Sequence, residues 1–264
     1  MRALVITVTA DEVEMASDAL WARGVVAIEE RVGPHGTIEL WTSLGDEIGY
    51  DDIGLPTRWP WRLEDVDEAV SETWREFAEP IWVDSDLVVQ PRWIEFDPPT
   101  GVTVLKIDPG VTFGMGDHPT TMLSLRALRR ELTPGDRVLD VGCGSGVLAI
   151  AAMKFGAGSA TAIDIAPAAV PVTLANAAAN DVAVEVSTTP LAEIAGNFQV
   201  VVANILAPTL VALAPDLRRV LAPGGALVIS GVLEDAHQHV LDALEPLQVV
   251  ATDIQDGWAE VTLR

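Results

Sequence analysis

The chain has 264 residues, of which 49% are hydrophobic, and its 39 acidic and 16 basic side chains give a formal net charge of −23. Such a composition is typical of a globular protein with a substantial core and excludes a disordered or fibrous chain. The negative charge argues against direct binding of nucleic acid, which needs clustered Lys and Arg. No stretch approaches the roughly 20 apolar residues of a membrane span. The single cysteine, Cys143, and the lack of an export signal predict a cytoplasmic location without membrane association.

The acidic excess is concentrated in the first part of the chain. Residues 1–100 hold 22 acidic and 7 basic side chains, a net charge of −15, whereas residues 101–264 hold 17 and 9, a net charge of −8. Two interpretations remain open. The acidic surface keeps the protein solvated, as in a salt-adapted organism, or it attracts a basic partner over a Debye length of about 10 Å.

The first 80 residues have the pattern of a small α+β domain. Alternating apolar residues and turn signals predict a β-α-β-β order, with a strand at Ala3–Thr9, a helix at Glu12–Trp21 and hairpin strands at Val25–Glu29 and Thr37–Trp41. Asp11 is a suitable N-cap for that helix. Apolar residues at helical spacing predict a second helix between Leu63 and Ala78. We therefore predict a separate small domain over residues 1–80.

Residues 81–110 are rich in proline and predict short linker strands. These strands are expected near Leu87–Val89, Trp93–Phe96 and Val102–Ile107. They separate the first domain from a second domain predicted over residues 111–264.

The rest of the chain repeats strand–helix units, which argues for a parallel sheet with helices on both faces. Strands are predicted at Arg137–Val141, Ala160–Asp164, Val182–Val186, Val200–Ala203 and Ala226–Ser230. A helix at Glu234–Leu244 and two strands at Gln248–Thr252 and Ala259–Leu263 follow. The turn between these two strands is too short for a parallel crossover, so they must pair antiparallel. The result is a mostly parallel α/β sheet that ends with an antiparallel strand.

A glycine-rich turn follows the first of these strands, with Gly142, Gly144 and Gly146 at alternate positions before a helix. Glycine suits a tight turn close to a ligand, and a helix N-terminus favours an anion. Asp164 ends the next strand, where a carboxylate can accept hydrogen bonds from both ribose hydroxyls. A nicotinamide enzyme would need a further glycine at Val147. The spacing present favours S-adenosylmethionine instead.

Two further segments are specific: Asp108–Thr121, which contains Phe-Gly-Met-Gly-Asp-His-Pro-Thr-Thr, and Asn204-Ile-Leu-Ala after the fourth predicted strand. Together with the glycine turn they closely resemble the bacterial PrmA family, which methylates ribosomal protein L11 of the large subunit. The resemblance covers about residues 74–264. It implies the fold of class I methyltransferases, which is Rossmann-like with a seven-stranded mostly parallel sheet, beside a small N-terminal α+β domain.

The resemblance also implies cofactor contacts at specific positions. Those that it implies for S-adenosylmethionine are Thr121, Gly142, Asp164 and Asn204. The glycine pattern adds Gly144 and Gly146, and the position next to Asp164 adds Ile165. Ile165 is placed to pack on the adenine face. Met115 stands where the family has a small polar Thr, which puts a contact by that side chain in doubt.

Asn204 and His118 are the candidate catalytic residues. An amide at the end of this strand can accept hydrogen bonds from an amine and direct its lone pair at the methyl group, although an Asn can also simply turn the chain. Ile205 and Leu206 follow it without a stacking ring, which favours an aliphatic amine over a nucleobase. His118 either takes the amine's proton or orders its loop. Cys143 is interpreted as a small filler, and no metal ligand set is recognised.

The predicted function is therefore methylation of amines, lysine side chains or the N-terminal amine, in the basic ribosomal protein L11, by an enzyme expected to act as a monomer. Residues 1–80 are predicted to recognise the substrate and residues 111–264 to form the S-adenosylmethionine-dependent methyltransferase domain, because the cofactor motifs lie after residue 108 and the acidic excess lies before residue 100. The alternatives left open are methylation of another protein or of a small-molecule amine, and a cofactor-binding module without catalysis.

Overall fold

The computed structural model describes residues 2–9, 12–21, 25, 28–42, 54–65, 78–110, 112, 114 and 116–264. The chain divides into two compact units, Met1–Ala78 and Glu79–Arg264. Residues 81–110, predicted as linker strands, lie within the second unit.

The first unit is built on a four-stranded antiparallel sheet. Its elements are β1 (Arg2–Val8), α1 (Val13–Trp21), β2 (Ile28–Val32), the short 3-10 helix η2 (Pro34–Gly36), β3 (Ile38–Thr42) and β4 (Trp61–Asp65). The strand order is β2-β3-β1-β4. Leu4, Ile6 and Leu40 on one face of the sheet pack with Ala16 and Leu20 of α1 in a common core.

The predicted β-α-β-β order is confirmed, but the prediction that a helix begins at Leu63 is wrong. Leu63 lies in β4, where it is paired with Leu4 of β1. The reason is long-range: β1 offers a free edge, and pairing satisfies the backbone groups of β4. The rest of that predicted helix, residues 66–77, and the predicted N-cap Asp11 lie outside the described residues.

A three-stranded sheet opens the second unit, with β5 (Ile81–Asp84), β6 (Leu87–Pro91) and β7 (Thr103–Ile107) in the order β5-β6-β7. The strand predicted at Trp93–Phe96 is absent there. The amide of Ile94 donates to the carbonyl of Pro91 at 3.2 Å, and the carbonyl of Ile94 accepts from Gln90 Nε2 at 2.8 Å. These local bonds fold the segment into a turn.

The second unit continues with a seven-stranded sheet in the order β10-β9-β8-β11-β12-β14-β13. Its strands are β8 (Arg137–Val141), β9 (Ser159–Ile163), β10 (Glu185–Ser187), β11 (Phe198–Asn204), β12 (Leu221–Leu233), β13 (Val249–Gln255) and β14 (Trp258–Leu263). All neighbours are parallel except those of β14, which is antiparallel to both β12 and β13. The predicted sheet and its antiparallel strand are therefore confirmed.

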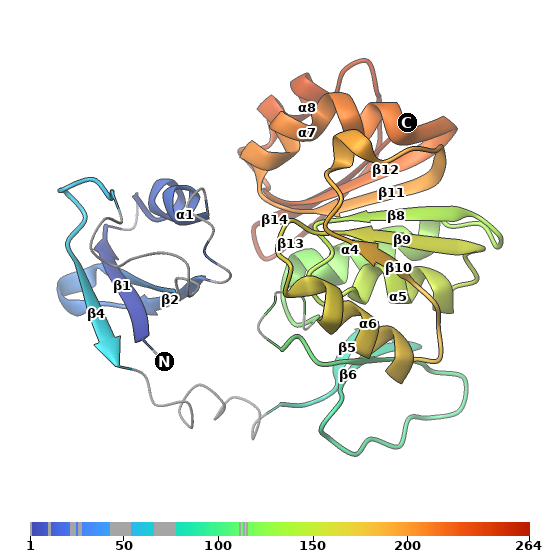
Figure 1. Ribbon diagram of the computed structural model, residues 1–264, viewed down its shortest axis with the longest axis horizontal. Helices are drawn as coiled ribbons and strands as arrows, with labels where there is room; N and C mark the ends of the chain where they lie inside the picture. Colours follow the sequence, from blue (N-terminus) through green and yellow to red (C-terminus); the bar gives the residue numbers. More distant parts are fainter. Residues whose placement is uncertain are drawn as a thin grey trace. The chain divides into compact units, whose positions relative to one another are not determined.

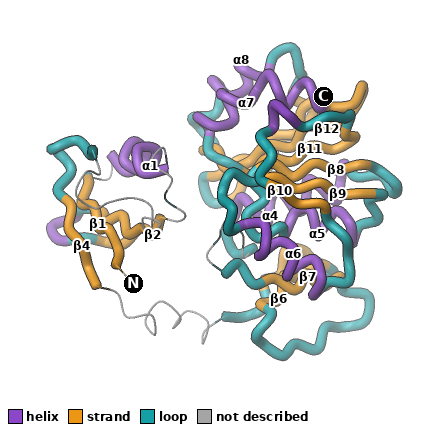
Figure 2. Tube along the Cα trace, in the orientation of Figure 1, coloured by secondary structure: helices purple, strands orange, loops and turns teal. Residues whose placement is uncertain are grey.

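Helices cover both faces of this sheet (Figure 1). They are α4 (Pro119–Glu131), α5 (Val147–Lys154), α6 (Ala169–Ala179), α7 (Ala207–Val220) and α8 (Gln238–Leu244), with the short η4 (Leu191–Glu193) between β10 and β11. Figure 2 shows α4, α5 and α6 on one side and α7 and α8 on the other. Two apolar cores result, one on each face of the sheet.

Some bounds differ from prediction. The last helix begins at Gln238 rather than Glu234, because residues 234–236 form a turn in which the amide of Ala236 donates to the carbonyl of Leu233 at 3.4 Å. β8 and β11 lie side by side at the centre of the sheet, and α5 and α7, which follow them, lie on opposite faces. Ligands of such sheets bind beyond the carboxyl ends of the strands at this point.

Candidate active site

The glycine turn connects β8 to α5 at the carboxyl end of the sheet. Gly142, Gly144 and Gly146 have φ values of +76°, +51° and +79°, which side chains other than glycine rarely adopt. A Cβ on Gly142 would lie 2.3 Å from Ile205 Cγ2, and one on Gly146 would lie 2.5 Å from Thr173 Cγ2. At these two positions a side chain would therefore clash with the protein itself, so glycine is also required by the packing of the turn.

Asp164 ties the end of β9 to the glycine turn. Its Oδ2 accepts a hydrogen bond from the amide of Gly144 at 2.9 Å, and its Oδ1 accepts one from the amide of Ala166 at 2.9 Å. A carboxylate has about four lone-pair sites, so two remain for the ribose hydroxyls. Ile165, the next residue, is 93% exposed. An apolar side chain so exposed beside this carboxylate fits the face of an adenine ring.

Asp140 on β8 is buried beneath the turn. Its Oδ2 accepts a hydrogen bond from the amide of Ala149 at 3.0 Å, whereas Oδ1 finds no partner among the described residues. Burial raises the pKa of Asp140 to about 7, and the nearby Asp164 carboxylate adds to the increase. A buried charged acceptor without a donor is costly, which is why burial favours the protonated, uncharged carboxyl here. The donors, acceptors and exposed apolar surface around the turn thus fit a nucleoside cofactor.

Thr121 and Asn204, which are 83 residues apart, meet above the carboxyl end of β11. Asn204 is the last residue of β11, and its Nδ2 lies 3.5 Å from Oγ1 of the buried Thr121 on α4, a long hydrogen bond. This contact leaves the carbonyl oxygen of the Asn204 side chain as an acceptor. The two predicted site residues are thus brought together.

His118 is the N-cap of α4. Its Nδ1 accepts a hydrogen bond from the amide of Thr120 at 3.3 Å and lies 2.7 Å from Thr120 Oγ1. Because a backbone amide only donates, the proton of the neutral ring belongs on Nε2. This geometry supports the loop-ordering role over the role of proton acceptor, since the Nδ1 lone pair is already used.

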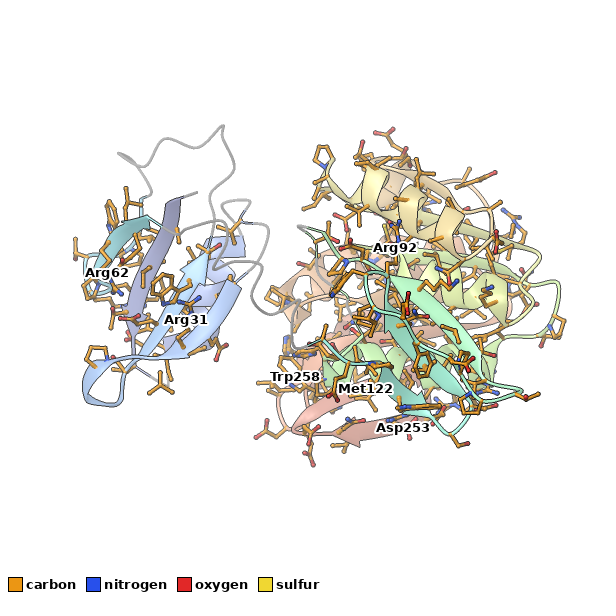
Figure 3. All side chains as sticks on the ribbon, turned by 90° about the horizontal axis from the view of Figure 1, so that it is seen from below. Arg31, Arg62, Arg92, Met122, Asp253 and Trp258 are labelled. Atoms are coloured by element: carbon orange, nitrogen blue, oxygen red, sulfur yellow. The ribbon has the colours of Figure 1, made fainter. Side chains whose placement is uncertain are left out.

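Trp258 is a site residue that no sequence motif indicates. It is the first residue of β14, and its ring lies edge-on to that of His118 with 5.1 Å between the centroids. Figure 3 shows Trp258 beside Met122 of α4, on the side where α4 meets β14. An aromatic ring here forms an apolar wall next to the N-cap of α4.

The protonation of His118 predicts how stability depends on pH. Burial lowers the pKa of His118 from 6.5, outweighing the raising effect of the Asp117 carboxylate. The stability that the neutral ring contributes is therefore present above pH 6.5 and is lost as the pH falls through the lower pKa of the folded state. Protonation would also abolish the cap acceptor and place a positive charge at a helix N-terminus.

We therefore expect the Tm of the wild type to fall more between about pH 7 and pH 5 than that of His118→Asn, because Asn is a good N-cap that does not titrate. Thermal unfolding of both proteins across this range measures the difference. Parallel Tm curves would contradict the assigned role of His118.

Cys143 is buried in the glycine turn, with its Sγ 3.7 Å from Thr173 Oγ1. Burial raises the pKa of the Cys143 thiol, and the Asp140 carboxylate raises it further. A thiol kept protonated in this way is a packing residue rather than a nucleophile. Among the described residues no three His, Cys, Asp or Glu side chains are grouped to hold a metal, and no helix there is long and apolar enough to cross a bilayer.

Comparison with known proteins agrees with this geometry. The model of the family described as "Ribosomal protein L11 methyltransferase (PrmA)" matches residues 56–264. A protein of that name from Geobacter metallireducens is 50% identical over 169 residues, which cover 64% of this chain and 56% of the relative. One from Geobacter sulfurreducens is 45% identical over 200 residues, which cover 75% of this chain and 67% of the relative. The chain thus spans little more than half the length of the first relative.

A solved structure is also similar. The "ribosomal protein L11 methylase" from Lactobacillus delbrueckii subsp. bulgaricus has a TM-score of 0.67 and 32% identity, and the match covers 71% of this chain and 98% of that chain. Its likeness and the strand order identify the sheet of the second unit as that of class I methyltransferases. This chain belongs to the PrmA family of ribosomal protein L11 methyltransferases.

Proposed function

We propose that the protein transfers methyl groups from S-adenosylmethionine to amines of ribosomal protein L11. The observation that carries the proposal is the meeting of Asn204 with Thr121 beside His118, at the same edge of the sheet as the glycine turn and Asp164. The relatives are named for methylation of this ribosomal protein. The net charge of −23 suits a basic protein partner rather than nucleic acid. The proposal includes that the enzyme methylates this partner as a monomer in the cytoplasm.

Residues from β8, β9, α4 and β11 would hold the cofactor at the carboxyl edge of the sheet. Asp164 binds the ribose, Ile165 covers the adenine, and the backbone of Gly142, Gly144 and Gly146 lines the other end. Thr121 and Asn204 close the reactive end. The bound cofactor supplies a methyl group on a positively charged sulfur, which is already activated for transfer.

Asn204 orients the acceptor. Its side-chain carbonyl accepts a hydrogen bond from the amine while Nδ2 is held by Thr121, so the amine's lone pair has a defined direction. A lysine amine must first lose a proton, which costs about 4.6 kcal/mol at pH 7. An apolar surrounding lowers that cost by disfavouring the ammonium, and the Trp258 ring contributes to it. Ile205 and Leu206 after Asn204 favour such an aliphatic amine, of lysine or of the chain's N-terminus.

Replacing Asp164 with Ala is expected to raise the Kd for S-adenosylmethionine by about 30- to 150-fold, the equivalent of about 2–3 kcal/mol, because hydrogen bonds to a charged group are lost. Isothermal calorimetry measures this change. Asp136→Ala is a matched control, since that carboxylate also accepts a backbone hydrogen bond, from Thr133 at 2.8 Å, but lies before β8 at the other end of the strand. Equal Kd values for both variants would refute the assignment of Asp164.

The proposed function is tested in cells by deleting the gene and comparing ribosomal proteins by mass spectrometry. The expected result is loss of methylation from the amines of ribosomal protein L11 alone. Unchanged L11 with loss of methylation from another protein or a small molecule would favour that substrate instead.

A further inference from the structure

Helix α6 contains a fully buried asparagine, Asn176, and a second buried asparagine, Asn180, is its C-cap residue one turn later. Buried amides need hydrogen-bond partners, and each of these two has several. The partners differ, however, and the difference separates a structural residue from one that serves the cofactor site.

Asn180 fastens α6 to the edge of the three-stranded sheet. Its Oδ1 accepts from the amide of Lys106 at 2.9 Å, and its Nδ2 donates to the carbonyl of Lys106 at 2.7 Å and to that of Asn176 at 2.8 Å. The side chain therefore pairs with β7 as another strand would. None of these bonds reaches the glycine turn.

Asn176 connects the glycine turn to the start of the segment Asp108–Thr121. Its Nδ2 donates to the carbonyls of Asp108 and Ser145, both at 2.9 Å, and its Oδ1 accepts from the amide of Asp108 at 3.0 Å. Arg92 Nη1 lies 3.4 Å from the same oxygen. One amide thus holds two backbone segments that are about 37 residues apart in the chain.

Ser145 makes a second connection between the same two segments. It is fully buried, and its Oγ donates to the carbonyl of Gly114 at 2.7 Å and accepts from the amide of Val147 at 3.3 Å. The segment Asp108–Thr121 is therefore joined to the glycine turn at Asp108, through Asn176, and at Gly114, through Ser145. The predicted site residues His118 and Thr121 lie at the far end of this segment.

We propose that Asn176 is a positioning residue for the cofactor: it sets the glycine turn and the segment leading to Thr121 in their binding arrangement. The amide touches neither the reacting atoms nor Asn204, and it acts through Ser145 and Asp108. Without it, ordering these two segments would have to be driven by cofactor binding, which lowers the apparent affinity. The inference concerns the cofactor alone and stands whichever amine is the substrate.

The test compares Asn176→Ala with Asn180→Ala. Both variants remove a buried amide with several hydrogen bonds from the same helix, so a merely structural role predicts similar losses of Tm and no difference in cofactor binding. We expect calorimetry with S-adenosylmethionine to show a Kd raised about tenfold or more in Asn176→Ala and within about twofold of wild type in Asn180→Ala, the tenfold factor being that of about one lost hydrogen bond. Equal Kd values in the two variants would overturn the proposal.

Ser145→Ala provides a second variant in case Asn176→Ala does not fold. It removes the connection to Gly114 together with the longer hydrogen bond from the amide of Val147, and it keeps Asn176 in place. It is expected to raise the Kd about fivefold or more, with faster amide hydrogen exchange at Asp108, Thr112 and Thr121 in the cofactor-free protein. An unchanged Kd together with unchanged exchange in this variant would overturn the proposal as well. Because no protein substrate is used, failure here is distinguishable from failure of the proposed methylation of L11.

Discussion

Replacing Asn204 with Ala is expected to lower the rate of methyl transfer by about 100-fold or more, while the Kd for S-adenosylmethionine rises by less than about fivefold. Asn204 is the side chain proposed to direct the amine, and misplacement of a reacting group by about 1 Å costs about this factor. The cofactor keeps its contacts at Asp164 and the glycine turn, so its affinity depends less on this residue.

Single-turnover kinetics with L11 separate the chemical step from product release. Thr121→Ala is a graded control, because it removes the partner that holds Asn204 Nδ2 but keeps the accepting carbonyl. Its transfer rate is expected to lie between those of the wild type and Asn204→Ala. A transfer rate in Asn204→Ala equal to that of the wild type would show that the residue only turns the chain after β11.

A fragment of residues 79–264 is expected to bind S-adenosylmethionine with nearly the Kd of the whole chain, yet to methylate intact L11 at least about 100-fold more slowly. All proposed cofactor residues lie after residue 108, whereas residues 1–100 carry a net charge of −15. We attribute recognition of the basic protein to the first unit, Met1–Ala78, and the transfer to the second. The charge is expected to raise the association rate and to lose its effect in high salt.

Activity of the whole chain and of the fragment is compared at low and high salt, with calorimetry to confirm that the fragment still binds cofactor. The similarity to the Lactobacillus structure covers 71% of this chain but 98% of that chain. A chain of about the length of the fragment therefore folds on its own in that protein, which supports the fragment as a folded unit. Equal methylation of L11 by both proteins would remove the recognition role and leave the acidic surface of the first unit as a solvated face.

The sheet of the second unit was predictable because its buried strands are apolar and short. Arg137–Val141 has the predicted bounds, and the short turn at Asp256 and Gly257 required the antiparallel pairing of β13 and β14. β4 was not predictable in the same way. Its charged residues Arg62 and Glu64 alternate with Leu63, which fits the spacing of a helix as well as that of a strand, and only pairing with β1 decides between them.

The candidate site was predictable where one local motif carries the chemistry. The glycine turn and Asp164 follow successive strands, so their meeting follows from the parallel order. Trp258 and Asn176 were not indicated, because neither residue stands in a recognisable pattern. Trp258 contacts His118, which is 140 residues away, and the hydrogen-bond partners of Asn176 are about 31 to 84 residues away. The close packing at Gly146 was not predictable either, because the side chain that leaves no room for a Cβ there is Thr173 of α6, which is distant in the sequence.

The central claim is tested most directly by incubating the purified chain with S-adenosylmethionine and L11 and measuring the mass of L11. The account predicts that L11 gains whole methyl groups, that peptide mapping places them on lysine side chains or on the N-terminal amine, and that Asn204→Ala slows their appearance by about 100-fold. L11 that stays unmethylated, with a wild-type protein shown by calorimetry to bind the cofactor, would contradict it.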